Sequence, residues 1–73
     1  MIVVYSGLRQ KDIIELVSQI EVDSKQVFSF NRKEGIQIQF NLELEVDNPV
    51  DLVKKKIKDS SFGRALNFTV ERK

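Results

Sequence analysis

One row of carboxylates in this chain could bind a metal ion. Glu43, Glu45 and Asp47 occupy alternate positions, and carboxylate oxygens are the ligands that hard cations such as calcium and magnesium prefer. Side chains two positions apart on a strand are separated by about 6.6 Å, too far for two of them to grip one ion without help from a loop. We therefore interpret the row as an acidic, solvent-facing surface, and we predict no metal site.

A run of lysines is the second charged group. Its members are Lys54, Lys55, Lys56 and Lys58. They could contact the phosphates of a nucleic acid, but a helix would spread them over a wide arc, and Asp51 and Asp59 lie among them. A solvated helix face, with cations near the negative end of the helix dipole, is the simpler interpretation. Nucleic-acid contact through these lysines is kept as the alternative function.

Groups suited to catalysis are few. The chain contains no histidine and no cysteine, so it lacks the commonest general base, the commonest metal ligand and all thiol chemistry. Ser6 and Gly7 follow an apolar run and could hold an anion at a helix N-terminus, although capping of that helix by Ser6 is the simpler interpretation. The remaining candidates for catalysis are Ser6, Tyr5, the lysines and the carboxylates, and their spacing in the sequence shows no catalytic constellation. We predict that the protein is not an enzyme and uses no cofactor.

Length and charge narrow the class further. The 73 residues leave room for one small domain, residues 1–73, and a hydrophobic fraction of 41% is ordinary for a globular protein. Twelve basic residues against eleven acidic ones give a net charge of +1, which argues against a dedicated nucleic-acid binder. No stretch approaches the roughly 20 apolar residues of a membrane span. We therefore expect a soluble cytoplasmic protein without membrane contact.

The strongest structural signal is a strict alternation over residues 36–47. Apolar side chains take the even positions and polar side chains take the odd ones. Because successive side chains of a strand point to opposite faces, this pattern predicts one long strand with an apolar and a polar face. The strand lies in the middle of the chain, so the other elements must supply its neighbours and cover its apolar side.

Weaker patterns predict the remaining elements. Residues 1–5 form an apolar, β-branched run, which predicts a central strand covered on both faces. A helix is expected over about residues 8–20, and a second one begins at Pro49, capped by Asp47 or Asn48. Residues 21–24 read as a polar link. Two further strands are expected over residues 26–32 and 65–71.

The turn between the two middle strands can be argued from parity. Phe28 and Phe30 must share a face with the even residues of the long strand, so paired residue numbers must sum to an even number. A three-residue loop over 33–35, with Gly35 in a left-handed conformation, satisfies this condition and pairs Phe30 with Ile38. A two-residue turn does not.

The order strand, helix, strand, strand, helix, strand predicts a ferredoxin-like α+β fold. This is a βαββαβ two-layer sandwich with both helices on one face of an antiparallel sheet of strand order 4-1-3-2. We expect the core between the layers to contain Ile13, Val17, Phe28, Phe30, Phe40, Leu42, Ile57 and Phe68.

The face without helices is the predicted site of function. If Ile2 and Val4 point at the helices, Val3 and Tyr5 lie on this face beside the polar side of the long strand. RNA-recognition domains of this topology stack bases on aromatic residues there, and only Tyr5 could do so here. We predict a non-enzymatic protein-interaction module whose partner is another protein or a second copy in a homodimer. The residues expected to make the contact are Val3, Tyr5, Val27, Gln39, Asn41 and Glu43.

Overall fold

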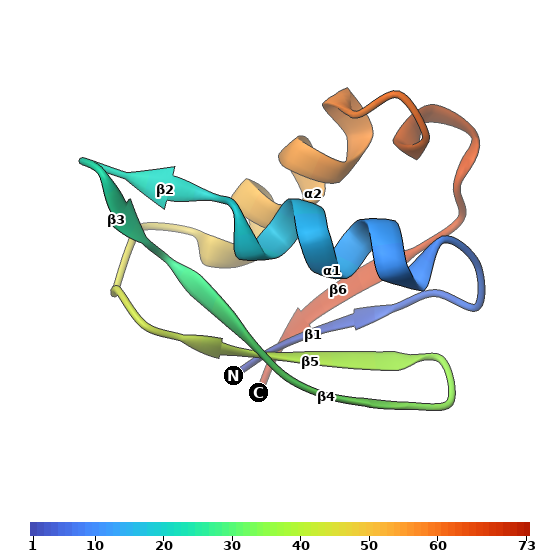
Figure 1. Ribbon diagram of the computed structural model, residues 1–73, viewed down its shortest axis with the longest axis horizontal. Coiled ribbons are helices and arrows are strands. Elements are labelled where there is room, and N and C mark those ends of the chain that lie inside the picture. Colours follow the sequence, from blue (N-terminus) through green and yellow to red (C-terminus); the bar gives the residue numbers. More distant parts are fainter.

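The computed structural model describes residues 1–73 and has two layers, with two helices packed on one face of a four-stranded antiparallel sheet (Figure 1). The predicted α+β class is confirmed. The sheet contains β1 (Ile2–Tyr5), β4 (Phe28–Glu34), β5 (Gln37–Leu42) and β6 (Thr69–Arg72), in the spatial order β4-β5-β1-β6. The helices are α1 (Gln10–Ser18) and α2 (Pro49–Asp59), and a short 3₁₀ helix, Gly63–Ala65, follows α2. The two-residue strands β2 (Glu21–Val22) and β3 (Lys25–Gln26) form a separate hairpin.

The core lies between the sheet and one aliphatic stripe on each helix. α1 buries Ile13 and Val17, and α2 buries Val53 and Ile57, which is the spacing of side chains on one helix face. From the sheet, Ile2 and Val4 of β1 point into the same core, as predicted. They face it together with Ile38 and Phe40 of β5, Phe28 of β4 and Val70 of β6.

Most of the predicted core residues are buried, but Phe30 is not. Leu42 and Phe68 are partly buried against the core, whereas the Phe30 side chain is 43% exposed. β4 is an edge strand, so Phe30 has a neighbouring strand on one side only. Its ring packs edge-on against Phe40, with 6.2 Å between ring centroids. The prediction that Phe30 is fully buried was therefore wrong.

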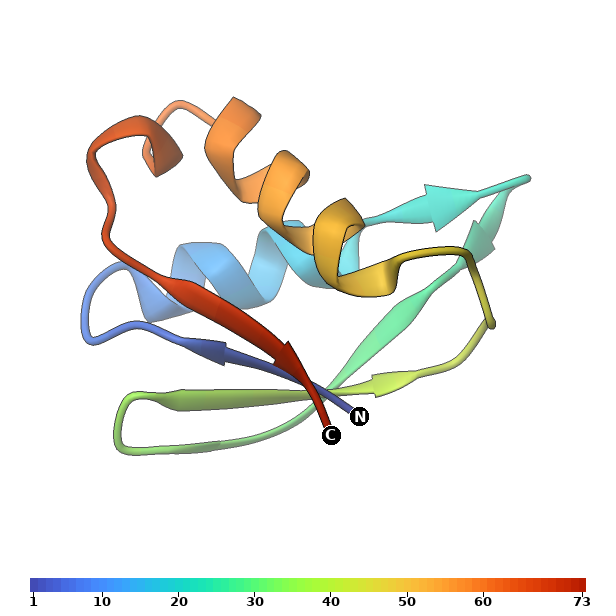
Figure 2. The same ribbon diagram turned by 180° about the vertical axis from the view of Figure 1, so that it is seen from behind.

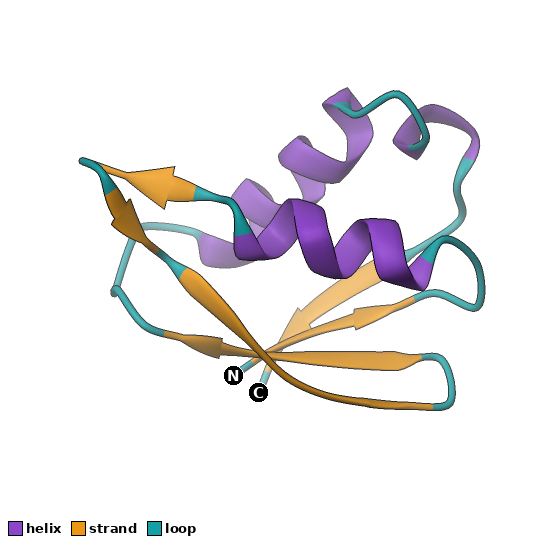
Figure 3. Ribbon diagram, viewed as in Figure 1, coloured by secondary structure: helices purple, strands orange, loops and turns teal.

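The long strand predicted over residues 36–47 is only half as long. β5 ends at Leu42, and the following residues run as a loop toward α2 (Figure 3). β5 runs out of partners there, because β1 begins at Ile2 opposite Phe40 and β4 begins at Phe28 opposite Leu42. The side chains still alternate after the strand ends. Leu44 and Val46 pack against the core while Glu43, Glu45 and Asp47 are exposed.

The hairpin between β4 and β5 corrects the parity argument. Phe30 pairs with Phe40 and not with Ile38, and the turn is Gly35-Ile36 instead of residues 33–35. Gly35 does have a positive φ of 60°, as predicted. A β-bulge between Phe30 and Arg32 inserts one extra residue, which changes the parity along the hairpin. The phenylalanines therefore keep the predicted face although the turn has two residues.

Both helices begin at a residue with left-handed backbone instead of a side-chain cap. Arg9 precedes α1 with φ 56°, and Asn48 precedes α2 with φ 51°; neither side chain makes a capping hydrogen bond. The Ser6 hydroxyl donates to the Leu8 carbonyl at 2.8 Å and so bridges the loop before α1. The capping role predicted for Ser6 is wrong, because Arg9 is the N-cap residue of α1. Asn48 does occupy the predicted N-cap position of α2, but its side chain makes no capping hydrogen bond. Pro49 does occupy the first turn of α2.

Two other segments differ from the prediction. The expected polar link over 21–24 is the β2–β3 hairpin, whose turn residues Asp23 and Ser24 both have positive φ, 53° and 65°, as in a type I′ turn. The last strand begins at Thr69 because its only partner, β1, ends at Tyr5, which lies opposite Thr69. Of the residues predicted to form it, Ala65 belongs to the 3₁₀ helix.

Candidate functional site

The candidate site is the sheet face that carries no helix, called the open face below. Its two central strands, β1 and β5, present Val3 and Tyr5 beside Gln37, Gln39 and Asn41. None of these five side chains is charged. Val3 is only 1% exposed, because Gln39 and Glu71 are its direct neighbours on the two flanking strands.

Val27 does not belong to the open face. It is buried in the core, and its backbone N–H donates to the carbonyl of Ile20 at 3.2 Å. β4 begins only at Phe28, so the alternation that placed Val27 opposite Phe28 does not extend to it. With Val27 in the core and Val3 covered, Tyr5 is the one predicted apolar contact residue that remains accessible on this face.

Tyr5 is held by the last strand. Its hydroxyl donates to Glu71 Oε2 at 3.1 Å, and Lys73 Nζ lies 5.7 Å from its ring centroid. Hydrogen bonding to Tyr5, and then the charge of its phenolate, raise the pKa of Lys73 above its usual value. Glu71 and Lys73 therefore both contact Tyr5 at the border between β1 and β6.

The other end of the open face is a network of hydrogen bonds between β4 and β5. Ser29 Oγ donates to Glu43 Oε1 at 2.7 Å, and Asn31 Nδ2 donates to Asn41 Oδ1 at 2.9 Å. Asn41 Nδ2 also donates to Ser29 Oγ at 3.4 Å. These bonds link the polar side chains of β4 and β5 to one another across the face. The predicted contact residues Asn41 and Glu43 are thus brought together, while Gln39 lies beside Val3.

The carboxylates of the predicted acidic row point to different partners. Glu43 accepts from Ser29, and Glu45 pairs with Arg72 at 3.1 Å. No group of three or more acidic side chains gathers at a distance suited to a metal ion. The row is therefore divided between the open face and the strand β6.

The four lysines of α2 point to different sides of the helix. Lys54 and Lys58 line a hollow of about 190 Å³ together with Phe68, Thr69 and Val70. Lys56 lines another hollow on the α1 side, and Lys55 is exposed. No lysine of the chain takes part in an ion pair, because all three ion pairs use arginine.

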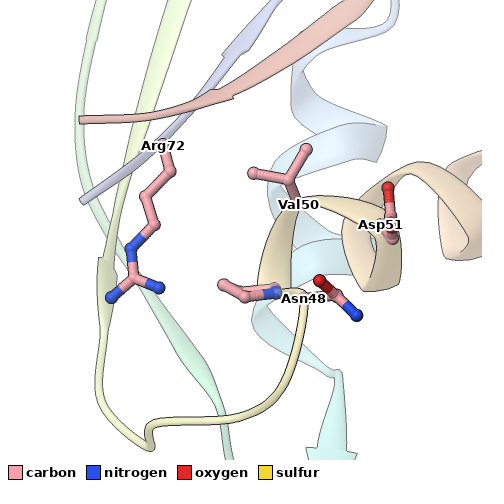
Figure 4. A pocket seen from close by; sticks show the side chains of 5 residues that line it. Asn48, Val50, Asp51 and Arg72 are labelled. Carbon is pink, nitrogen blue, oxygen red and sulfur yellow. The ribbon is translucent and has the colours of Figure 1, made fainter.

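A third hollow, of about 280 Å³, lies at the start of α2. Figure 4 shows the Arg72 side chain of β6 facing the first turn of α2 across it, with Asn48, Val50 and Asp51 on the helix side. A helix N-terminus attracts anions, but here Asp51 supplies a negative charge and Arg72 is paired with Glu45. This hollow is therefore poorly suited to a free anion.

Comparison with known proteins gives no relative. No family model, no curated protein and no solved structure matches the chain. No helix is both long and apolar enough to cross a membrane. Any function must therefore be argued from the surfaces described above.

Sequence reasoning found part of the open face and missed its partners on the last strand. Glu71 and Lys73 orient Tyr5, yet neither was among the predicted contact residues. The alternation of the last strand carries the signal for Glu71, since Val70 points into the core and its neighbours must point away.

Proposed function

We propose that the protein is a non-enzymatic interaction module that binds another protein, or a second copy of itself in a dimer, through the open face. The observation that supports this proposal is the distribution of charge. The central strands carry Tyr5 and three amides, whereas the charged side chains of the face lie at its border: the Arg32–Glu34 ion pair and Glu71 on the edge strands, and Glu43 just beyond the end of β5. Protein interfaces share this anatomy, with a charge-poor centre enriched in tyrosine and a polar rim.

The fold proposed to carry this face is ferredoxin-like, with strand order 4-1-3-2. Support comes from the main sheet when the two-residue strands β2 and β3 are left out of the numbering. Its members β6, β1, β5 and β4 are then the fourth, first, third and second strands in chain order, and each neighbouring pair is antiparallel. Such an arrangement leaves one whole sheet face free for a partner.

Replacing Tyr5 by glutamate tests the proposed surface. A carboxylate at the charge-poor centre should weaken association at least about tenfold, because a desolvated charge without a partner is costly. Unfolding of the monomer should change little, since Tyr5 lies outside the core. Leu8→Glu is the matched control, because Leu8 is 71% exposed and lies in the loop before α1.

The measurements are sedimentation at increasing concentration for self-association, and quantitative cross-linking in cell extract for a partner. The proposal predicts that complexes of the wild type are lost in Tyr5→Glu and kept in Leu8→Glu. It is refuted if the wild type stays monomeric at millimolar concentration and its cross-linked partners are the same for all three proteins.

Contact with nucleic acid through Lys54, Lys55, Lys56 and Lys58 is the second candidate function. The observation in its favour is that none of these lysines is neutralised by an ion pair. Because the four lysines point to different sides of α2, a single nucleic-acid strand could contact only some of them. If three phosphates are neutralised, affinity should fall roughly 40-fold between about 50 and about 200 mM salt. Binding without this salt dependence excludes the nucleic-acid function.

A further inference from the structure

The outer edge of β6 is free to accept another strand. Met1 and Lys73 exchange both backbone hydrogen bonds, with Met1 N donating to Lys73 O at 3.0 Å and Lys73 N donating to Met1 O at 2.8 Å. Hydrogen-bonded and non-hydrogen-bonded pairs alternate along an antiparallel ladder. Val70 and Arg72, which face Val4 and Ile2, therefore belong to non-hydrogen-bonded pairs. Their N–H and C=O groups point away from β1, and no turn, loop or side-chain hydrogen bond reaches them.

The helix α2 forms a wall beside this free edge. Two of the three hollows of the molecule lie between α2 and β6, one lined by Arg72 and the other by residues 68–70. Figure 2 shows β6 and α2 next to one another on the side turned to the viewer, with α1 behind them. The seam between them is an open groove with an unpaired strand along one side.

Charge favours acidic side chains in the part of the groove beside Lys54 and Lys58, whereas the part beside Asp51 and Arg72 offers no unpaired positive charge. Lys54 and Lys58 lie one helical turn apart on its wall, and neither has an acidic partner. Phe68 and Val70 supply an apolar lining on the strand side. Because side chains of a strand alternate between faces, a strand added to β6 would direct every second side chain toward α2. Acidic side chains at those positions would meet the two lysines.

We propose that the groove between α2 and β6 binds an extended acidic peptide segment of a partner protein, which adds to the sheet as a further strand. Its backbone pairs with Val70 and Arg72, as in other cases of strand addition, and its carboxylates pair with Lys54 and Lys58. This site is separate from the open face and does not depend on the function proposed for that face.

The opposite edge of the sheet is less suited to the same role. β4 carries a bulge between Phe30 and Arg32, and a bulge interrupts the regular spacing that a new strand must match. Arg32, Lys33 and Glu34 place charges of both signs along that strand. No hollow lies beside β4 that could hold the side chains of an added strand.

The test uses an eight-residue peptide of alternating glutamate and threonine, capped at both ends, titrated into the ¹⁵N-labelled protein. The proposal predicts that the amide signals of Val70 and Arg72 move downfield and exchange more slowly with solvent, because they gain hydrogen bonds. The amides of Lys54 and Lys58 should also shift. A peptide with glutamine in place of glutamate should bind about tenfold more weakly, since two charge pairs are lost.

Two pairs of variants distinguish the contribution of the lysine charges to peptide affinity from the contribution of backbone pairing with β6. Lys54→Gln with Lys58→Gln should lower peptide affinity about tenfold, whereas the control pair Lys11→Gln with Lys55→Gln, at exposed helix positions outside the hollows, should lower it less than about twofold. Arg72→Pro and Arg72→Thr both remove the guanidinium, but only proline removes the outward N–H. Proline is tolerated where the N–H of an edge strand faces solvent, so Arg72→Pro should fold and bind about fivefold more weakly than Arg72→Thr.

Three results would overturn the proposal. Equal peptide affinity of Arg72→Pro and Arg72→Thr would exclude strand addition, and equal effects of the two lysine pairs would exclude a specific acidic contact. An eight-nucleotide oligothymidylate that shifts the Lys54 and Lys58 amides at lower concentration than the peptide would make the lysines a nucleic-acid surface instead.

Discussion

Replacing Gly63 by alanine should destabilise the fold more than the same change at either of the other two glycines. A Cβ atom at this position would lie 1.6 Å from the carbonyl oxygen of Ile57 and 2.5 Å from its carbonyl carbon. Real Cβ atoms essentially never approach another atom closer than 3.0 Å. Both contacts are backbone atoms, so no side chain can rotate away. The end of α2 and the segment that follows it would have to separate.

The expected loss in the free energy of unfolding has two contributions, overpacking and a lost hydrogen bond. Overpacking of a tight site costs about 1–3 kcal/mol. The Gly63 N–H also donates to Ser60, to the hydroxyl at 3.1 Å and to the carbonyl at 3.3 Å, and loss of one buried donor costs about 1 kcal/mol more. We therefore expect Gly63→Ala to lower the free energy of unfolding by about 2–4 kcal/mol. A domain of 73 residues is stable by only about 4–11 kcal/mol.

The other two glycines provide matched controls. A Cβ at Gly7 would lie 3.7 Å from Ile36 Cγ2, which is ordinary contact, so Gly7→Ala should be neutral or stabilising by up to about 1 kcal/mol. Gly35 has open space around it but a φ of 60°, and Gly35→Ala should cost about 1–2 kcal/mol through backbone strain.

Urea unfolding followed by far-ultraviolet circular dichroism measures all three variants. With a slope of about 1 kcal/mol per molar urea for a chain of this size, the midpoint of Gly63→Ala should fall by about 2–4 M. The expected ranking of damage is Gly63, then Gly35, then Gly7. If Gly63→Ala unfolds at the same urea concentration as Gly7→Ala, the close packing inferred at the end of α2 is wrong.

Two further predictions concern the core and the last strand. Phe40→Ala should lower the free energy of unfolding by about 3–5 kcal/mol, because Phe40 is fully buried; an unchanged urea midpoint would show that β5 is not central to the core. The pKa of Lys73 is raised by Tyr5, so the stabilisation from this contact is present below pH 10.5, the ordinary lysine value, and is lost as pH rises through the higher folded value. An NMR titration should place the Lys73 pKa lower in Tyr5→Phe than in the wild type, and equal values would contradict the contact.

The sequence predicted which way side chains point better than it predicted where strands end. The direction of a side chain follows from periodicity, which is a local property, and this identified the buried stripes of α1 and the core-facing residues Ile2 and Val4. The end of a strand depends on its neighbours. The alternation continues past Leu42, but no partner strand continues with it, so the pattern alone overestimated the length of β5.

The hairpin and the open face show the second limit of sequence reasoning. The parity argument assumed an unbroken ladder, and a single extra residue beside Phe30 was enough to change the turn while leaving the face of the phenylalanines intact. Alternation likewise placed Val27 on the open face, although the strand begins one residue later. Tyr5 and Gln39 were located correctly because they lie inside regular strands with partners on both sides, and Asn41 because its pairing with Ser29 of β4 continues the same ladder.

The pairing of Met1 with Lys73 also determines how the domain would respond to a force applied at these two residues. Met1 and Lys73 are hydrogen-bonded to one another at the ends of neighbouring antiparallel strands. A force that pulls Met1 and Lys73 apart acts across this ladder and loads one residue pair at a time, so the hydrogen bonds between β6 and β1 break one after another instead of shearing together. The domain should therefore extend at low force, and the edge that offers Val70 and Arg72 to an added strand would be the first part of the sheet to be lost.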